Sequence, residues 1–220
     1  MKYKKPTRLS DPFNDFSQEE LTGILAKKDA ELGWRDFDCI FQGRMPAGTY
    51  EEVCYYIPPV CTYIENQRDA CNFFEHFSIW IEVNYERVKE DGLIAPIVSA
   101  FHTLFRKATS SFNLEYNGNH AVYPSGASSV EEVIEVFFRL SPTCNEFCPD
   151  ALFPELKEDL SFIHAEWIVY ISTGMSMLSS RNIQSVLSSS DYRKALDLIN
   201  RNLEAILNDQ KSYAFWKERI

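Results

Sequence analysis

The sequence lacks the short motifs that mark many enzyme classes. It contains no HExxH, no GxSxG, no P-loop and no GxGxxG. None of its four histidines has Asp or Glu three residues earlier, so the Glu-x-x-His pattern of di-metal helical bundles is also missing. These absences disfavour metal-dependent, serine-hydrolase and nucleotide chemistry, although a site can still be assembled from residues distant in sequence. We therefore expect no metal, no cofactor and a non-enzymatic role.

Long apolar runs are also missing. The first residues are basic but continue with Pro6, Ser10 and Asp11, where a secretory signal needs an uninterrupted apolar stretch. Apolar segments such as 73–83 and 167–171 are broken by polar residues well short of the roughly 20 needed to span a membrane. The six cysteines of this 220-residue chain fit reduced, mostly buried thiols better than the disulfide framework of a short secreted domain. We expect a cytoplasmic protein that does not enter a membrane.

Basic residues do not cluster anywhere in the chain. A protein that binds the phosphate backbone needs grouped Lys and Arg to displace counterions, so we expect no nucleic-acid partner. The formal net charge is −10, and the segment 131–166 holds nine acidic residues against two basic ones. An acidic surface of this kind steers a basic protein towards it, over the range that salt screening allows.

Composition and periodicity predict an all-α protein. Hydrophobic residues make up 45% of the chain and charged residues 25%, which is ordinary for a globular domain. Apolar residues recur at helical spacing through most of the chain, which favours a single-domain bundle of about six to eight helices over residues 1–220. At this length folding buries roughly 70% of the surface of the unfolded chain, so one core suffices for stability.

Local signals place the ends of several helices. Three predicted capping boxes are Ser17 with Glu20, Thr49 with Glu52, and Ser129 with Glu132. The pair Pro58-Pro59 predicts a kink or break at Ile57, followed by a second piece that runs to about Asn66. The other predicted helices cover 69–91, about 96–108, a long stretch from about 156 to 178, and a last segment after residue 190.

Two segments predict other structure. Residues 33–48 contain three glycines and a proline around large apolar side chains, which predicts a loop folded onto the core. Residues 112–123 alternate apolar and polar positions around Asn117-Gly118, which predicts a small β-hairpin; a structureless excursion is the alternative.

The chain also carries two similar segments. Residues 46–53 and 124–133 share the order Pro, Gly, helix cap, Glu-Glu-Val. They suggest a repeat of two three-helix units, 46–109 and 124–208, although capping-box chemistry alone also generates such a match.

The leading functional hypothesis is a protein that binds another protein. The acid-rich segment carries large aromatic side chains that can serve as interface anchors. An inhibitor such as an immunity protein, which neutralises a basic toxin, fits this profile. The predicted partner-binding residues are Glu131, Glu132, Glu135, Phe138, Phe147 and Asp150.

Two alternatives stay open. One is an enzyme or small-ligand binder with a pocket between helices near His164 and Glu166, with Cys144 or Cys148 at its rim. Against it, a histidine at a helix boundary is more often hydrogen-bonded to the core, and His164 and Glu166 lie two residues apart, on different sides of a helix. The other is a homodimer that associates through an aromatic face.

Overall fold

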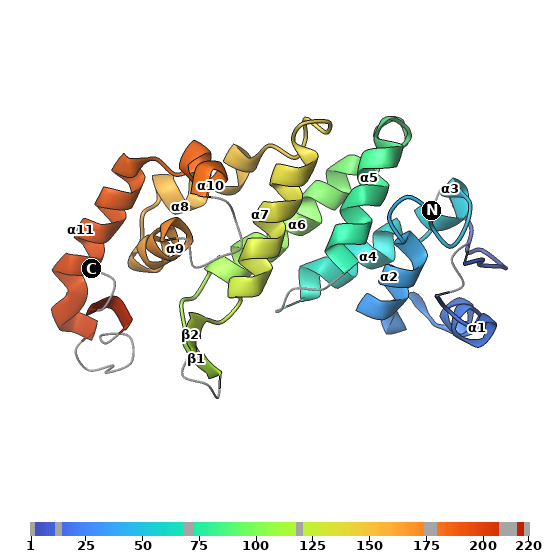
Figure 1. Ribbon diagram of the computed structural model, residues 1–220, viewed down its shortest axis with the longest axis horizontal. Coiled ribbons are helices and arrows are strands. Elements are labelled where there is room, and N and C mark those ends of the chain that lie inside the picture. Colours follow the sequence, from blue (N-terminus) through green and yellow to red (C-terminus); the bar gives the residue numbers. More distant parts are fainter. Residues whose placement is uncertain are drawn as a thin grey trace. The chain divides into compact units, whose positions relative to one another are not determined.

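The computed structural model describes residues 3–11, 15–67, 73–117, 121–173, 180–206 and 215–217. Within these residues it contains eleven α-helices, two short 3₁₀ helices and one two-stranded antiparallel sheet (Figure 1). The predicted all-α class is confirmed, and so is the hairpin. None of the described helices combines the length and the apolar character that crossing a membrane requires.

The chain divides into two compact units. Unit 1 comprises Met1–Leu104 and Val136–Phe147, and unit 2 comprises Phe105–Glu135 and Cys148–Ile220. Two of the three boundaries fall inside helices, α6 (Ile94–Thr109) and α7 (Ala127–Leu140), and the third lies between Phe147 and Cys148. The single-domain interpretation and the repeat of 46–109 in 124–208 stay predictions.

Unit 1 is built around an aromatic core. Its other elements are α1 (Gln18–Ala26), η1 (Asp29–Glu31), α2 (Trp34–Phe41), α3 (Tyr50–Cys54), α4 (Ile57–Asn66) and α5 (Phe73–Glu90). Helices α2 and α5 pack side by side (Figure 1). The ring of Phe41 lies 4.5 Å from that of Phe77 and 5.2 Å from that of Trp80, and all three are buried. Such tilted and edge-on ring contacts add to the free energy gained by burying large apolar surfaces.

Unit 2 has a second aromatic cluster. Its elements are β1 (Leu114–Asn117), β2 (Ala121–Pro124), η2 (Pro149–Leu152), α8 (Pro154–Glu158), α9 (Phe162–Ser172), α10 (Ser180–Val186) and α11 (Ser189–Ile206). Helices α9 and α11 pack against each other (Figure 1). The ring centre of Phe112 lies 5.2 Å from that of Trp167 in α9, and its ring stacks on that of Trp216 with the ring centres 5.5 Å apart. The Trp167 Nε1–H donates to the Ser111 carbonyl at 3.0 Å, so its polar atom is satisfied inside the cluster.

Several predicted helix ends are confirmed. Ser17 caps α1 and Thr49 caps α3, each with a reciprocal bond from the predicted glutamate. The chain breaks after Cys54 and α4 starts at Ile57, where Pro58 and Pro59 occupy a first turn whose N–H groups need no helical partner. Helix α5 ends before Gly92, whose φ of 72° is the left-handed geometry that terminates helices. The predicted start of this helix at residue 69 lies outside the described residues.

The two strands of the predicted hairpin run antiparallel. Leu114 pairs with Pro124 and Asn117 with Ala121 in an antiparallel ladder. Residues 118–120, including the predicted turn glycine and His120, lie outside the described residues.

The predicted loop at 33–48 is wrong in its first half, because α2 covers Trp34–Phe41. Asp36 starts this helix by accepting the Gly33 N–H at 2.8 Å, and Phe37, Ile40 and Phe41 form a buried stripe at helical spacing. Of the glycines that suggested a loop, Gly33 is the N-cap of this helix, and Gly43, with a φ of 59°, follows its end.

The predicted third capping box is also wrong. Helix α7 starts at Ala127, directly after Gly126, so Ser129 is a buried residue of the first turn. The φ of 81° at Gly126 lets the chain turn into the helix three residues earlier than the cap pattern suggested.

The predicted long helix from 156 to 178 is interrupted. Helix α8 ends at Glu158, and Ser161 caps a new helix, α9, by accepting the His164 backbone N–H at 3.1 Å. The helical spacing of apolar residues continues through the break, because α8 and α9 each bury an apolar face. The spacing alone does not reveal where one helix ends and the next begins. Leu178 lies outside the described residues.

Candidate functional site

Three predicted partner-binding carboxylates lie on one helix of unit 2. Glu131, Glu132 and Glu135 belong to α7, and each is half-buried. Glu131 and Glu135 are four residues apart, so they are neighbours on the helix surface. Burial, together with the negative charges of Glu135 and Glu132, raises the pKa of Glu131 to about 7. The helix therefore holds like charges close together at a site where water screens them incompletely.

The other predicted partner-binding residues are placed differently. Asp150 is exposed in η2 of unit 2, whereas Phe138 is half-buried in unit 1. Phe147 is fully buried in unit 1, where its ring lies 5.3 Å from Phe137. A partner cannot reach the Phe147 side chain in this structure, so it contributes to the core of unit 1.

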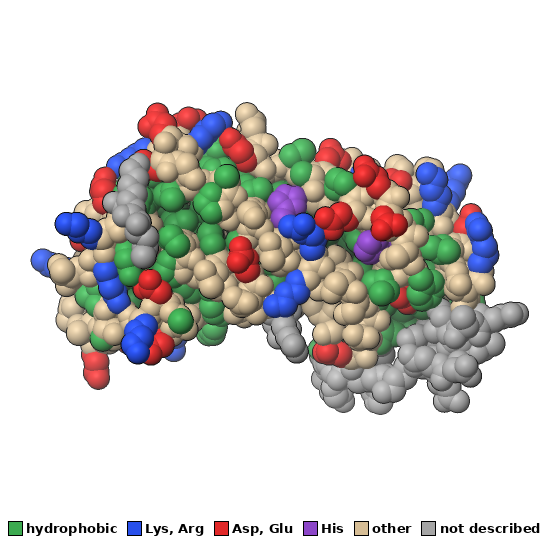
Figure 2. Space-filling view, turned by 180° about the vertical axis from the view of Figure 1, so that it is seen from behind, with side chains coloured by type: hydrophobic (Ala, Val, Ile, Leu, Met, Phe, Trp, Pro, Cys, Tyr) green, Lys and Arg blue, Asp and Glu red, His purple; other side chains and the backbone are tan. Residues whose placement is uncertain are grey.

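Several other acids of the segment 131–166 already have partners inside the protein. In unit 1, Glu146 accepts a hydrogen bond from Tyr85 and forms an ion pair with Lys89 at 3.0 Å. In unit 2, Glu155 lies 3.6 Å from Arg106. Over the face shown in Figure 2, acidic and basic side chains of the described residues are interspersed. Glu146 and Glu155 therefore already have a basic side chain beside them.

His164 and Glu166 do not form a shared site. The ring Nδ1 of His164 lies 2.7 Å from the Asp159 carbonyl, which fixes the imidazole over the start of its own helix. Glu166 is buried and accepts a hydrogen bond from Trp216 Nε1 at 2.9 Å. Each side chain has its own structural partner, as expected for residues that point to different sides of a helix.

Unit 1 contains a charged cleft that no sequence motif predicted. It lies between α1 and α2 and has a volume of about 230 Å³. Lys27 Nζ lies 2.6 and 2.8 Å from the two carboxylate oxygens of Asp36, and Arg35 Nη2 lies 3.1 Å from Oε1 of Glu20. Hydrogen bonds from Ser17 hold the pKa of Glu20 below its ordinary value.

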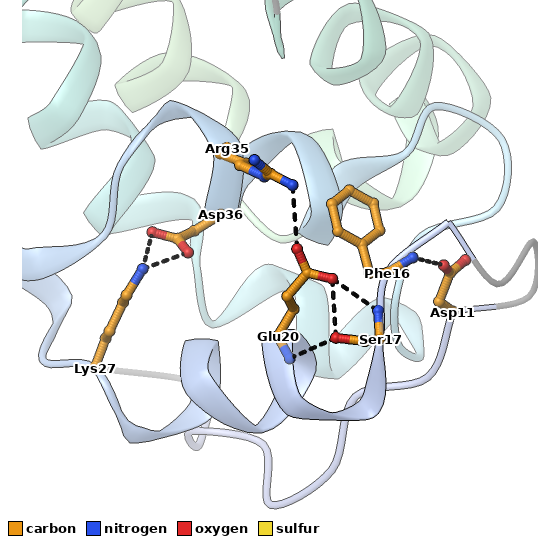
Figure 3. Close-up of polar contacts among 7 residues, drawn as sticks. All are labelled: Asp11, Phe16, Ser17, Glu20, Lys27, Arg35 and Asp36. Atoms are coloured by element: carbon orange, nitrogen blue, oxygen red, sulfur yellow. Dashed lines mark hydrogen bonds and ion pairs between the residues drawn. The ribbon is translucent and has the colours of Figure 1, made fainter.

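The charged side chains that line the cleft pair with one another. Both basic side chains drawn in Figure 3 point to carboxylates of the same cluster, so they are already paired. The two ion pairs connect residues nine and fifteen positions apart in the chain, on different helices. Such pairs leave no periodic signal in a sequence, and the cluster serves to fasten α1 to α2.

The described part of the chain groups no metal ligands, and four of its five cysteines are buried. Among these residues no three His, Cys, Asp or Glu side chains are grouped to hold a metal ion. Cys39, Cys54, Cys61 and Cys144 are buried free thiols, and Cys148 is an exposed one. Burial raises the pKa of Cys61 to about 12 and that of Cys54 to about 11, which makes these two thiols poor nucleophiles at neutral pH.

Comparison with protein-family models, with curated proteins and with solved structures gave no match.

Proposed function

We propose that this chain is a non-enzymatic binding protein that recognises a basic protein partner through the carboxylates of α7. The observation that carries the proposal is the half-buried pair Glu131 and Glu135, with Glu132 beside it. A carboxylate with a raised pKa is electrostatically strained at neutral pH. A Lys or Arg side chain brought to this helix relieves that strain, so binding gains free energy beyond an ordinary surface ion pair.

The proposal includes a cytoplasmic location. The five described cysteines are all free thiols, and four of them are buried. Free thiols of this kind are typical of compartments that keep cysteine reduced. An inhibitor of a basic toxin is the kind of partner relationship we favour, because such inhibitors use acidic faces to reach their targets quickly.

The test is recovery of a partner from the native cell with three forms of the full chain. One is wild type, the second carries Glu131→Lys, Glu132→Lys and Glu135→Lys, and the third is a matched control. The control carries Glu82→Lys, Glu86→Lys and Glu90→Lys, which reverses the same number of charges on exposed positions of α5. Circular dichroism checks that all three forms are folded.

The expected result is one basic protein that the wild type and the α5 control retain and that the α7 variant loses. Its retention also weakens as salt rises from about 50 to 500 mM, because the attraction is electrostatic. Loss with both variants, or no protein above background with any form, contradicts the proposal.

A further inference from the structure

Unit 1 contains an open pocket that no part of the partner-binding proposal uses. It lies between α4 and the segment around η1 and has a volume of about 420 Å³. This is within the range of small-molecule sites, roughly 300–1,000 Å³. The residues that line it are Asp29, Ala30, Leu32, Pro58, Pro59, Thr62, Tyr63 and Asn66.

The pocket is apolar over most of its lining, with one fixed aromatic ring. Leu32, Pro58 and Pro59 supply aliphatic surface. The ring of Tyr63 lies 5.2 Å from that of Phe37 and 5.9 Å from that of Phe73, so core packing holds it in place. A ring held in this way presents a preformed surface to a ligand, which reduces the entropy lost on binding.

Two polar side chains of the lining, Thr62 and Asn66, donate to carbonyls of their own helix. The Thr62 hydroxyl donates to the Pro58 carbonyl at 3.1 Å. The Asn66 side-chain amide donates to the Thr62 carbonyl at 2.8 Å. The Thr62 hydroxyl and one of the two Asn66 amide N–H groups are therefore already used within the helix.

Asp29 is the one ionisable carboxylate in the described lining, which includes no Lys, Arg or His. The Tyr55 hydroxyl donates to its Oδ1 at 2.8 Å and orients the group. Within the described residues no further hydrogen bond reaches Oδ2, and Asp29 is half-buried. The pocket thus combines apolar walls, an aromatic ring and an oriented negative charge with a spare acceptor.

We propose that this pocket binds a small apolar amine in its ammonium form. The ammonium group donates to Oδ2 of Asp29, and the hydrocarbon part covers Leu32, Pro59 and Tyr63. A neutral apolar ligand would cover the carboxylate without replacing its water, which is unfavourable. An anionic ligand would meet a negative charge, and the described lining offers it no cation.

The experiment titrates the full chain with 3-phenylpropylamine and, separately, with 3-phenylpropanol, by ligand-observed NMR and calorimetry. The two probes have the same shape and size and differ in charge. We expect the amine to bind with a Kd of about 1 mM or tighter, which is typical of a ligand of this size, and at least about tenfold more tightly than the alcohol.

Two variants and a control separate the pocket from general attraction to an acidic protein. Asp29→Asn keeps an acceptor for Tyr55 and removes the charge, so it should abolish the preference for the amine. Thr62→Trp places an indole in the pocket and should abolish binding although Asp29 is still charged. Asp197→Asn removes one exposed charge from α11 and should leave binding unchanged.

Thermal denaturation of each variant confirms that it is folded, and failure of one variant to fold leaves the other as the test. Equal affinity for amine and alcohol overturns the proposal. The proposal is also overturned if the amine binds both Asp29→Asn and Thr62→Trp as tightly as wild type. Absence of amine binding to wild type at about 10 mM overturns it as well.

Discussion

Replacing Glu131 with Gln is expected to make the protein more stable at alkaline pH and to leave it unchanged in acid. The pKa of Glu131 rises from 4.5 to about 7 on folding, first through burial and then through Glu135 and Glu132. Each tenfold change in proton affinity corresponds to about 1.4 kcal/mol, so full ionisation in the folded state is disfavoured by about 3 kcal/mol. Because Glu131 is only half-buried, solvent screens part of this, and we expect about 1–2 kcal/mol in practice.

The sign follows from proton linkage. The folded state holds the Glu131 proton more tightly than the unfolded state does, so the penalty is absent below about pH 4.5. It grows between pH 4.5 and about 7 and is complete above pH 7. Glu131→Gln removes the penalty and keeps the shape of the side chain.

Urea denaturation at pH 4, 6 and 8, followed by tryptophan fluorescence, measures the effect. The variant should exceed wild type by about 1–2 kcal/mol at pH 8 and match it within about 0.5 kcal/mol at pH 4. Glu158→Gln, which removes one exposed charge from the same unit, should show no such pH dependence. Equal pH profiles for wild type and Glu131→Gln would show that the carboxylate is not strained, and the reasoning for the α7 site would then fail.

Three further substitutions test individual contacts by urea denaturation. Asp36→Asn weakens the two-pronged ion pair with Lys27 in a mostly buried setting and should cost about 1–3 kcal/mol, more than an exposed pair would. Ser161→Ala removes the cap of α9 and should cost about 1 kcal/mol. Trp216→Phe keeps an aromatic ring in the cluster but removes the donor to buried Glu166, with an expected loss of about 1–3 kcal/mol.

Much of the helical structure could be predicted because its causes are local. The caps at Ser17 and Thr49, the break before Ile57 and the stop at Gly92 depend on residues within one turn of each other. Where local signals competed, prediction failed. At Gly33 a nearby carboxylate, Asp36, started a helix in a segment whose glycines suggested a loop.

The candidate sites were predicted less well. The carboxylates of α7 can be grouped from the sequence because they are close together in it, and their role stays a prediction, whereas the burial of Phe147 depends on the packing of Phe137 and Phe101 around it. The pocket beside Asp29 was missed, because its walls come from two segments about thirty residues apart that have no common motif. Sequence patterns also do not distinguish a histidine tied to a carbonyl, such as His164, from one that lines a crevice.

By itself the sequence determined that this chain is helical, where many of its helices begin and end, and that it carries excess negative charge. Those properties arise from interactions between residues a few positions apart, which the order of the amino acids specifies directly. Only the tertiary structure decided that Lys27 pairs with Asp36, that Glu166 is held by Trp216 and that Asp29 faces an apolar pocket. These contacts depend on which helix faces pack together, and that is settled by the burial of the aromatic cores.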